Sequence, residues 1–318
     1  MTRGYLAVDG GGSSTEFLLV NDNGQELLHF FVGSTSIKSV GAETACANIF
    51  AGVRQLFAFL EEADAAPAEV WGVWGLSGCD SAADQAEYEA MLTAAGLDLV
   101  YHRVVNDSLL ALRAVTAGSG IVLISGTGSI CVGVDNSGQT VRLGGWGYQV
   151  SDLGSGAWIG SQLLREALLF DDGCREDDPA FSLVYQQVGC ERGELGPAVA
   201  RMTHADQWAS FARIALECEQ SPLCDKIAGQ AAEYLVGYVS AVTSRMFKDQ
   251  PFMVVLAGGL FKSKTFAQRV LNLLDAPAQV LCVSPVLGGI AMAKHEAERC
   301  FWPSFDTRST KVNHLPIW

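Results

Sequence analysis

One order of local patterns occurs twice in this sequence, and it constrains the fold more than any other feature. Residues 4–9 (GYLAVD) have the pattern of a buried strand, and a glycine-rich turn and strands at 16–21 and 25–33 follow it. Residues 120–145 (GIVLISGTGSICVGVDNSGQTVRLGG) repeat the order of strand, glycine turn, strand, polar turn and strand. The repeat predicts two similar α/β domains, and two such domains facing each other would turn both glycine turns toward one cleft.

Further helices and strands are predicted between and after the two repeats. Helical periodicity marks 42–62, 82–96 and 109–118, and strand patterns mark 68–78, 99–105 and 251–259. Residues 155–247 are largely helical, with an acidic interruption at 171–179. We therefore place one domain at 1–117 and a second domain, with a helical insertion, at 118–318. The tail at 304–318 is predicted to be a surface strap.

The composition argues against several classes of function. Acidic side chains outnumber basic ones, 35 against 21, so the formal net charge is −14. Such a surface disfavours binding to nucleic acid or to an anionic membrane. The nine cysteines are scattered without a Cys-x-x-Cys pair, which is typical of free thiols in a reducing compartment. The sequence also has no run of about 18 apolar residues, the length that a membrane span needs. These features predict a cytoplasmic, globular protein.

Two glycine turns are candidate phosphate-binding sites. The residues are Gly11, Gly12 and Ser13 between the first two strands, and Gly126, Thr127 and Gly128 at the equivalent place in the repeat. Glycines lack Cβ atoms, so they permit positive φ angles and let backbone N–H groups approach a phosphate closely. Asp9, at the end of the first strand, could hold Mg²⁺ through water. Each turn alone could be a plain turn without a ligand, whereas the pair in equivalent places indicates two phosphate clamps.

A third glycine segment follows the strand at 251–259. Gly258 and Gly259 end this strand and precede a helix, so a flat base or a ribose could lie against their backbone. A plain strand-to-helix turn is the alternative. Gly288 and Gly289 open the last helix, where close packing of the helix against a sheet is the expected reason for them.

Two further segments carry candidate substrate-binding residues. Asp107 ends a strand and begins a helix, so its carboxylate could cap the helix or accept a proton from a substrate hydroxyl. Residues 144–156 place Trp146 and Asp152 among closely spaced glycines. A tryptophan ring offers an apolar face to a sugar, and an aspartate accepts hydrogen bonds from two hydroxyls. A purely structural loop is the alternative.

Taken in order, these motifs resemble those of the N-acetylglucosamine kinase and BadF/BadG/BcrA/BcrD ATPase group within the actin/hexokinase/Hsp70-like superfamily. The resemblance covers nearly the whole chain. It is strongest at DGGGSST (9–15), LSG (76–78), ND (106–107), ISGTGS (124–129), GGWG (144–147) and AGG (257–259). It implies an α/β fold with two ribonuclease-H-like (actin-like ATPase) domains that flank a nucleotide and sugar cleft.

The resemblance also implies roles for individual residues. Both glycine turns would bind the phosphates of ATP with Mg²⁺, and Gly258 and Gly259 would lie by the adenosine. Asp107 would act as the base toward the 6-hydroxyl of an amino sugar, for which N-acetylglucosamine is the first candidate. The sugar would be held by Ser36, Ser77, Gly78, Gly145, Trp146, Gly147 and Asp152.

Two departures from the family pattern fall on the substrate side. Ser36 stands where such kinases usually carry an asparagine. The segment that usually reads GDEGS is Ser151-Asp-Leu-Gly-Ser155 here, so Asp152 lacks an acidic neighbour. Lys38 could face the same pocket as Ser36 and favour an anionic sugar, or it could point to solvent. The sugar therefore stays open among N-acetylglucosamine, glucosamine and N-acetylmuramic acid.

Two other functions and the assembly state also stay open. Related ATPase activators use ATP hydrolysis to drive electron transfer through a cysteine-ligated cluster at a dimer interface, and no close pair among the nine cysteines supplies such ligands. A non-catalytic sugar sensor would be expected to lack Asp107 or one glycine turn, and the sequence has both. A kinase of this kind could form a homodimer.

Overall fold

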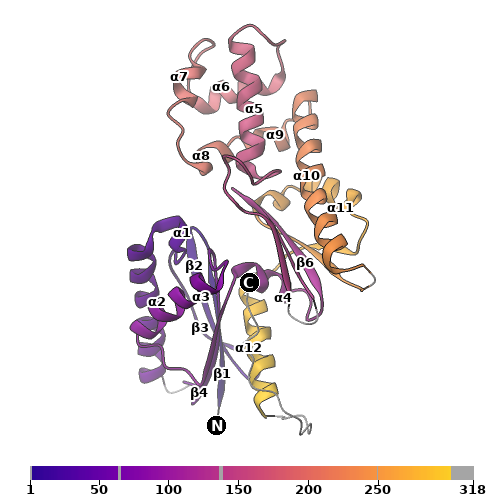
Figure 1. The fold of residues 1–318 in the computed structure, drawn as a ribbon. Helices are drawn as coiled ribbons and strands as arrows, with labels where there is room; N and C mark the ends of the chain where they lie inside the picture. The colour runs from indigo at the N-terminus through magenta and orange to yellow at the C-terminus, as the bar shows by residue number, and fades with distance from the viewer. Residues whose placement is uncertain (1, 64–65, 136–138, 249, 302–318) are drawn as a thin grey trace. The chain divides into compact units, whose positions relative to one another are not determined.

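The computed structural model describes residues 2–63, 66–135, 139–248 and 250–301 of the chain. The chain folds into two compact units (Figure 1). The first unit takes Met1–Ala117 and the segment from Leu281 on, and the second takes Gly118–Val280. The predicted strap at 304–318 lies outside the described residues.

The first unit is built on a five-stranded sheet in the order β3-β2-β1-β4-β5. Its strands are β1 (Arg3–Gly10), β2 (Ser14–Asn21), β3 (Glu26–Gly33), β4 (Glu69–Leu76) and β5 (Tyr101–Val105). The first three strands form an antiparallel meander, as the glycine turn and the Asn-Gly turn predict. The last two strands run parallel to β1, so the carboxyl ends of β1, β4 and β5 meet at one edge.

Helices cover both faces of this sheet because its central strands are apolar on both sides. The helices are α1 (Ile37–Val40), α2 (Ala42–Glu62), α3 (Ala82–Ala94), α4 (Asp107–Arg113) and α12 (Val286–Phe301). Leu6 and Val8 of β1 belong to a core formed with α2 and α3. Tyr5 and Ala7, which alternate with them, belong to a core formed with α4 and α12.

The second unit repeats the sheet topology of the first. Its strands are β6 (Gly120–Ser125), β7 (Ser129–Val134), β8 (Thr140–Gly144), β9 (Met253–Ala257) and β10 (Ala278–Val280), in the order β10-β9-β6-β7-β8. Strands β6, β7 and β8 form an antiparallel meander, and β9 runs parallel to β6. The duplication predicted from the local patterns is therefore confirmed at the level of strand order.

The helical insertion lies between β8 and β9, as predicted. It contains α5 (Gly156–Asp171), α6 (Pro179–Val188), α7 (Leu195–Val199), α8 (Ala205–Ala209), α9 (Ala212–Glu217) and α10 (Pro222–Met246). A short 3₁₀ helix, η1 (Gly259–Lys262), and α11 (Lys264–Leu273) follow β9. No helix in the described ranges combines the length and the apolar character needed to cross a membrane.

The sequence analysis grouped all of 118–318 in one domain, but the last helix belongs to the first unit. Helix α12 packs on β1, β4 and α4 of the first unit. Two glycines allow this close approach. A Cβ on Gly288 would lie 1.9 Å from the carbonyl oxygen of Leu110, and a Cβ on Gly289 would lie 2.7 Å from the Cβ of Ala7. The second unit therefore ends near Val280.

Candidate functional site

The first glycine turn joins β1 to β2. The Gly11 N–H donates to the Ser14 carbonyl at 2.9 Å, and the Gly11 carbonyl accepts from the Ser34 hydroxyl at 2.9 Å. In the described part of the chain, the N–H groups of Gly12 and Ser13 have no recorded acceptor. Neither Gly11 nor Gly12 has a positive φ angle. Glycine therefore serves here by leaving space beside the backbone. The other reason for glycine that the sequence allowed, a positive φ angle, does not apply to these two residues.

The second glycine turn joins β6 to β7 and lies against the amino end of α5. The Gly126 N–H donates to the Gly128 carbonyl at 2.9 Å. The N–H groups of Gly156 and Ala157, in the first turn of α5, donate to the carbonyls of Gly126 at 2.7 Å and Thr127 at 3.1 Å. Over the described ranges, the N–H groups of Thr127 and Gly128 have no recorded acceptor. The partial positive charge of the α5 terminus favours an anion beside this turn.

The third glycine segment lies next to the second turn. Gly258 has a φ of +102°, and a Cβ there would lie 2.4 Å from the carbonyl oxygen of Ser125. The nearest atom to a Cβ built on Gly126 is the backbone nitrogen of Gly259, at 3.8 Å. Of the residues predicted to bind nucleotide, the structure therefore brings together Gly126, Gly258 and Gly259 within the second unit.

Asp152 connects the tryptophan loop to the second glycine turn. Its carboxylate accepts from the Gly147 N–H at 3.2 Å. A Cβ on Gly128 would lie 2.7 Å from Asp152 Oδ2, so the aspartate fills the space beside that glycine. Asp152 is also the one non-glycine residue with a positive φ in the described chain, at 52°. Burial raises the pKa of this carboxyl above its usual range.

The tryptophan loop presents an aromatic ring to solvent. The Trp146 residue is 70% exposed, an unusual state for so large an apolar side chain. The Arg142 guanidinium lies 4.4 Å from the ring centroid and donates to the Gly145 carbonyl at 2.6 Å. This cation–π contact holds the loop while it leaves the ring accessible.

Asp107 is the first residue of α4, directly after β5. Asn106 occupies the N-cap, where its side chain accepts from the Ser108 N–H at 3.0 Å. Burial raises the pKa of Asp107 to about 6, and the charge of Asp80 raises it further. Hydrogen bonds from the Ser108 N–H and the Ser77 hydroxyl act in the opposite direction. The residue is therefore a half-buried carboxyl that releases its proton just below neutral pH.

Asp9 lies at the end of β1 and is electrostatically coupled to Asp107. Burial raises the pKa of Asp9 to about 7, and the charges of Asp107 and of Glu16 add to the shift. Glu16 is the cross-strand partner of Asp9 on β2. Several acidic groups thus share one edge of the first sheet, an arrangement that a cation would stabilise.

The predicted sugar-binding residues of the first unit lie together. Ser36 is buried and accepts from the Ser39 hydroxyl at 3.1 Å. A Cβ built on Gly78, whose φ is +89°, would lie 3.6 Å from Ser36 Oγ. Ser77, the neighbour of Gly78, donates its N–H to the Gly10 carbonyl at 2.8 Å and so joins the ends of β4 and β1.

Tyr88 organises this group of residues, and the sequence analysis did not identify it. Its hydroxyl donates to the Ser77 carbonyl at 2.9 Å and accepts from the Ile37 N–H at 3.0 Å. One side chain of α3 therefore fixes the loop after β3 to the turn after β4. Nothing in the sequence distinguishes Tyr88 from an ordinary apolar-face residue of a helix.

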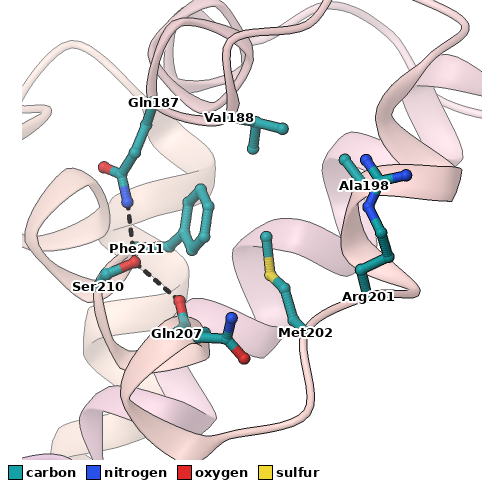
Figure 2. Close-up of a pocket in the computed structure, with 8 residues that line it drawn as sticks. All are labelled: Gln187, Val188, Ala198, Arg201, Met202, Gln207, Ser210 and Phe211. Carbon is teal, nitrogen blue, oxygen red and sulfur yellow. Dashed lines mark hydrogen bonds between the residues drawn. The ribbon is translucent and has the colours of Figure 1, made fainter.

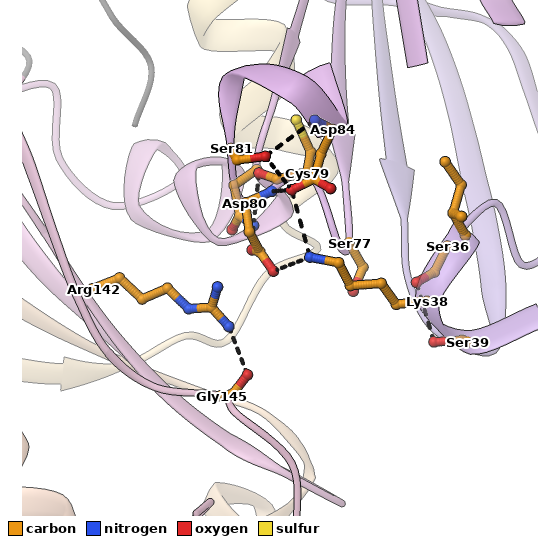
Figure 3. A network of polar contacts seen from close by, with 12 residues as sticks. Ser36, Lys38, Ser39, Ser77, Cys79, Asp80, Ser81, Asp84, Arg142 and Gly145 are labelled. Atoms are coloured by element: carbon orange, nitrogen blue, oxygen red, sulfur yellow. Dashed lines mark hydrogen bonds and ion pairs between the residues drawn. The ribbon is translucent and has the colours of Figure 1, made fainter. Parts of the chain in front are cut away.

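Lys38 is ion-paired within the first unit, which weakens the idea that it reads an anionic sugar. Its Nζ lies 2.7 Å from Asp80 Oδ2 and 3.5 Å from Asp84 Oδ2 (Figure 3). Two carboxylates thus already compensate its positive charge. The alternative, a Lys38 side chain that points to solvent without a partner, does not agree with these two ion pairs either.

A separate cavity of about 400 Å³ lies in the helical insertion (Figure 2). It is lined by Gln187, Val188, Ala198, Arg201, Met202, Gln207, Ser210 and Phe211. Its polar wall is internally bonded, since Gln187 donates to the Ser210 hydroxyl at 2.9 Å and Ser210 donates to the Gln207 carbonyl at 2.7 Å. No residue predicted from the sequence to bind nucleotide or sugar lines this cavity.

The comparisons with known proteins agree with the motif order and the repeated topology. The model of the BadF/BadG/BcrA/BcrD ATPase family matches residues 6–283. The chain belongs to this family. Among its relatives is an N-acetyl-D-glucosamine kinase of Dictyostelium discoideum, 28% identical over 84% of this chain and 88% of the relative. An N-acetylmuramic acid/N-acetylglucosamine kinase of Clostridium acetobutylicum is 34% identical over 51% of this chain and 53% of that protein.

Solved structures show that this member of the BadF/BadG/BcrA/BcrD ATPase family has the expected fold. A Chromobacterium violaceum protein, provisionally described as an N-acetylglucosamine kinase, superposes with a TM-score of 0.72. That likeness covers 92% of this chain and 99% of the other, at 24% identity. The two repeated α/β units are therefore those of the actin-like ATPase fold predicted from the sequence.

Proposed function

We propose that this protein is an ATP-dependent kinase that phosphorylates the 6-hydroxyl of an amino sugar, with N-acetylglucosamine as the first candidate. The observation that carries the proposal is Asp107, a half-buried carboxyl at the end of β5 whose pKa is raised to about 6. A base with that pKa is largely ionised at neutral pH and can still accept a proton in the transition state. The kinase names of the Dictyostelium and Clostridium relatives support the same reaction.

The two glycine turns would bind the phosphates of ATP. Each turn offers two N–H groups for which the described chain provides no acceptor: those of Gly12 and Ser13, and those of Thr127 and Gly128. The space beside Gly126 also suits a ligand, since a Cβ there would reach no described atom closer than 3.8 Å. Gly259, beside which a Cβ would meet nothing within 4 Å, leaves an open surface for ribose or base. These features fit a nucleotide triphosphate.

Asp9 would hold Mg²⁺ together with the phosphates. The fit rests on the pKa of Asp9, which burial and the charges of Asp107 and Glu16 raise to about 7. A divalent cation would relieve this repulsion and keep Asp9 ionised. The described residues contain no cluster of three or more ligands that could hold a metal ion. Mg²⁺ needs no such cluster, because it commonly binds one or two carboxylates, water and substrate phosphates. When bound, it would neutralise charge on the transferred phosphoryl group.

Asp107 would orient the sugar 6-hydroxyl and take its proton as the new P–O bond forms. The Ser108 N–H donates to Asp107 Oδ1 at 2.9 Å, and this hydrogen bond orients the carboxylate before the sugar arrives. General-base assistance of this kind contributes about 10²-fold to 10⁴-fold in rate. Positioning and charge stabilisation supply the rest of the acceleration in phosphoryl transfer.

The tryptophan loop and the serine loop would bind the sugar. The exposed Trp146 ring offers an apolar face, and Gly145, Gly147 and Asp152 lie next to it. Ser36 and Gly78 would contribute from the first unit. Ser36 presents one hydroxyl where the family pattern has an amide, so glucosamine and N-acetylmuramic acid remain alternative substrates. We also propose a cytoplasmic location, in keeping with the described cysteines, none of which is in a disulfide bond.

The test is ADP release from MgATP in the presence of N-acetylglucosamine, glucosamine or N-acetylmuramic acid, each against a reaction without sugar. We expect at least one amino sugar to raise the rate of ADP release many-fold, and Asp107→Asn to abolish that increase. Equal ADP release with and without every sugar would contradict the kinase and favour the ATPase-activator alternative. Sugar binding without any ADP release would favour a sensor.

A further inference from the structure

Three chain segments at one edge of the first sheet are joined by a single carboxylate. Asp80, in the turn after β4, uses both of its carboxylate oxygens, and Figure 3 shows its contact with Lys38. Oδ2 accepts from the Lys38 ammonium at 2.7 Å, and Oδ1 accepts from the Asn106 side-chain amide at 2.9 Å. The loop after β3 is thereby connected through the turn after β4 to the junction of β5 and α4.

Asn106 carries this connection to the proposed base. The residue is 5% exposed, and its Nδ2 also donates to the Cys79 carbonyl at 3.3 Å. Its Oδ1 accepts from the Ser108 N–H at 3.0 Å and from the Ser108 hydroxyl at 2.5 Å. The same Ser108 N–H donates to Asp107 Oδ1 at 2.9 Å. A displacement of the Asn106 side chain would therefore alter the bonds that orient the Asp107 carboxylate.

Lys38 contributes positive charge that helps to hold Asp80 in this arrangement. A second carboxylate, that of Asp84, lies 3.5 Å from the same ammonium group. Without the lysine, this ammonium group would no longer offset the repulsion between the two carboxylates, and the Asp80 carboxylate would shift. We propose that Lys38 is a positioning residue, which acts through Asp80 and Asn106 to hold Asp107 in line with the sugar hydroxyl. The inference rests on the proposed kinase function and gives Lys38 a role that involves no contact with the sugar.

The expected cost falls on catalysis and leaves the fold intact. The Lys38 side chain is 53% exposed, and ion pairs with an exposed partner contribute little to stability. A base displaced by about 1 Å can lose about 10²-fold in rate. We therefore expect Lys38→Met to lower kcat by about 10-fold or more while the melting temperature and the KM for ATP change little.

Four variants and one control test this inference. Lys38→Arg should recover most of the lost kcat, because it restores a positive charge beside Asp80. Asp80→Asn should lower kcat to a similar degree, and Lys38→Met combined with Asp80→Asn should be no slower than the slower single variant. The matched control is Lys294→Met in α12, since the Lys294 ammonium lies over the Tyr5 ring, 5.3 Å from its centroid. It should keep the wild-type kcat.

A second readout is independent of turnover. The NMR signal of the Asn106 side-chain amide should shift in Lys38→Met and stay in place in Lys294→Met. A wild-type kcat in Lys38→Met, or losses that multiply in the double variant, would overturn the role of Lys38 and leave the kinase function standing. A loss confined to N-acetylmuramic acid would show that Lys38 contacts the substrate directly, which also overturns it. A wild-type protein without sugar kinase activity would overturn the proposed function and this inference together.

Discussion

Replacing Asp107 with asparagine should stabilise the folded protein at neutral pH even though it removes the proposed base. Folding raises the pKa of this carboxyl from 3.8 to about 6, mainly through burial. The difference is about 2 pH units, and at about 1.4 kcal/mol per unit it corresponds to about 3 kcal/mol. Asparagine carries no charge and can keep the hydrogen bond from the Ser108 N–H to Oδ1. We expect a net gain of about 1–3 kcal/mol in the free energy of unfolding.

The size of this stabilisation depends on pH in a defined way. Between about pH 4 and about pH 6, the folded wild-type protein holds the Asp107 proton while the unfolded chain has released it. The free energy of unfolding of the wild type therefore falls as pH rises through this window. The advantage of Asp107→Asn should be small near pH 4, grow through the window and be complete above about pH 6.

The assay is urea unfolding at about pH 4.5 and about pH 7.5, without nucleotide or Mg²⁺. Asp84→Asn serves as a control of opposite sign. Burial raises the pKa of Asp84, but hydrogen bonds from the Ser81 hydroxyl and the Asp80 N–H, with the charge of Lys38, outweigh it and lower the pKa. That variant should lose stability at about pH 7.5. A stability change in Asp107→Asn that is equal at both pH values would refute this reasoning, and so would the absence of any gain at the higher pH.

The glycine turns and the paired carboxylates lead to four further predictions. Gly126→Ala should fold like the wild type, because its Cβ would reach no closer than 3.8 Å to the nearest atom, yet calorimetry should show ATP binding weakened at least about 10-fold. Gly128→Ala should instead lower the melting temperature, because its Cβ would lie 2.7 Å from Asp152 Oδ2. Asp9→Asn should raise the Mg²⁺ concentration for half-maximal activity by at least about 10-fold, and an unchanged Mg²⁺ dependence would remove it from the metal site. The kcat/KM of the wild type should rise with pH and level off above about pH 7, because Asp107 and Asp9 have pKa values of about 6 and about 7. A flat profile of kcat/KM between about pH 5 and about pH 8 would contradict a carboxylate base.

The repeated topology could be predicted because local signals determine it. The two meanders follow from apolar strands separated by glycine and Asn-Gly turns, and α2 has the predicted bounds of 42–62. The membership of α12 in the first unit could not be predicted. Its buried residues, such as Ile290 and Ala293, define an apolar face but do not indicate which sheet it covers. That choice depends on the fit of Gly288 against α4, which only the folded chain shows.

The sequence motifs mark candidate site residues, but the structure gives some of them a different physical reason. Gly128 was interpreted as part of a phosphate clamp, and the structure shows that a side chain there would collide with Asp152. Gly11 and Gly12 do not use the positive φ angles that glycine permits. The ion pair of Lys38 joins residues 42 positions apart in sequence, and no local pattern reports such a contact. Geometry of this kind depends on which strand ends become neighbours in the sheet.

The most direct test of the proposed function is the fate of the γ-phosphate. The protein should be incubated with γ-labelled ATP, Mg²⁺ and N-acetylglucosamine, and the label should then be located by chromatography and NMR. The proposed reaction predicts label on the 6-oxygen of the sugar, with little inorganic phosphate, and no labelled sugar with Asp107→Asn. Label recovered only as inorganic phosphate, at a rate that the amino sugars do not change, would contradict it.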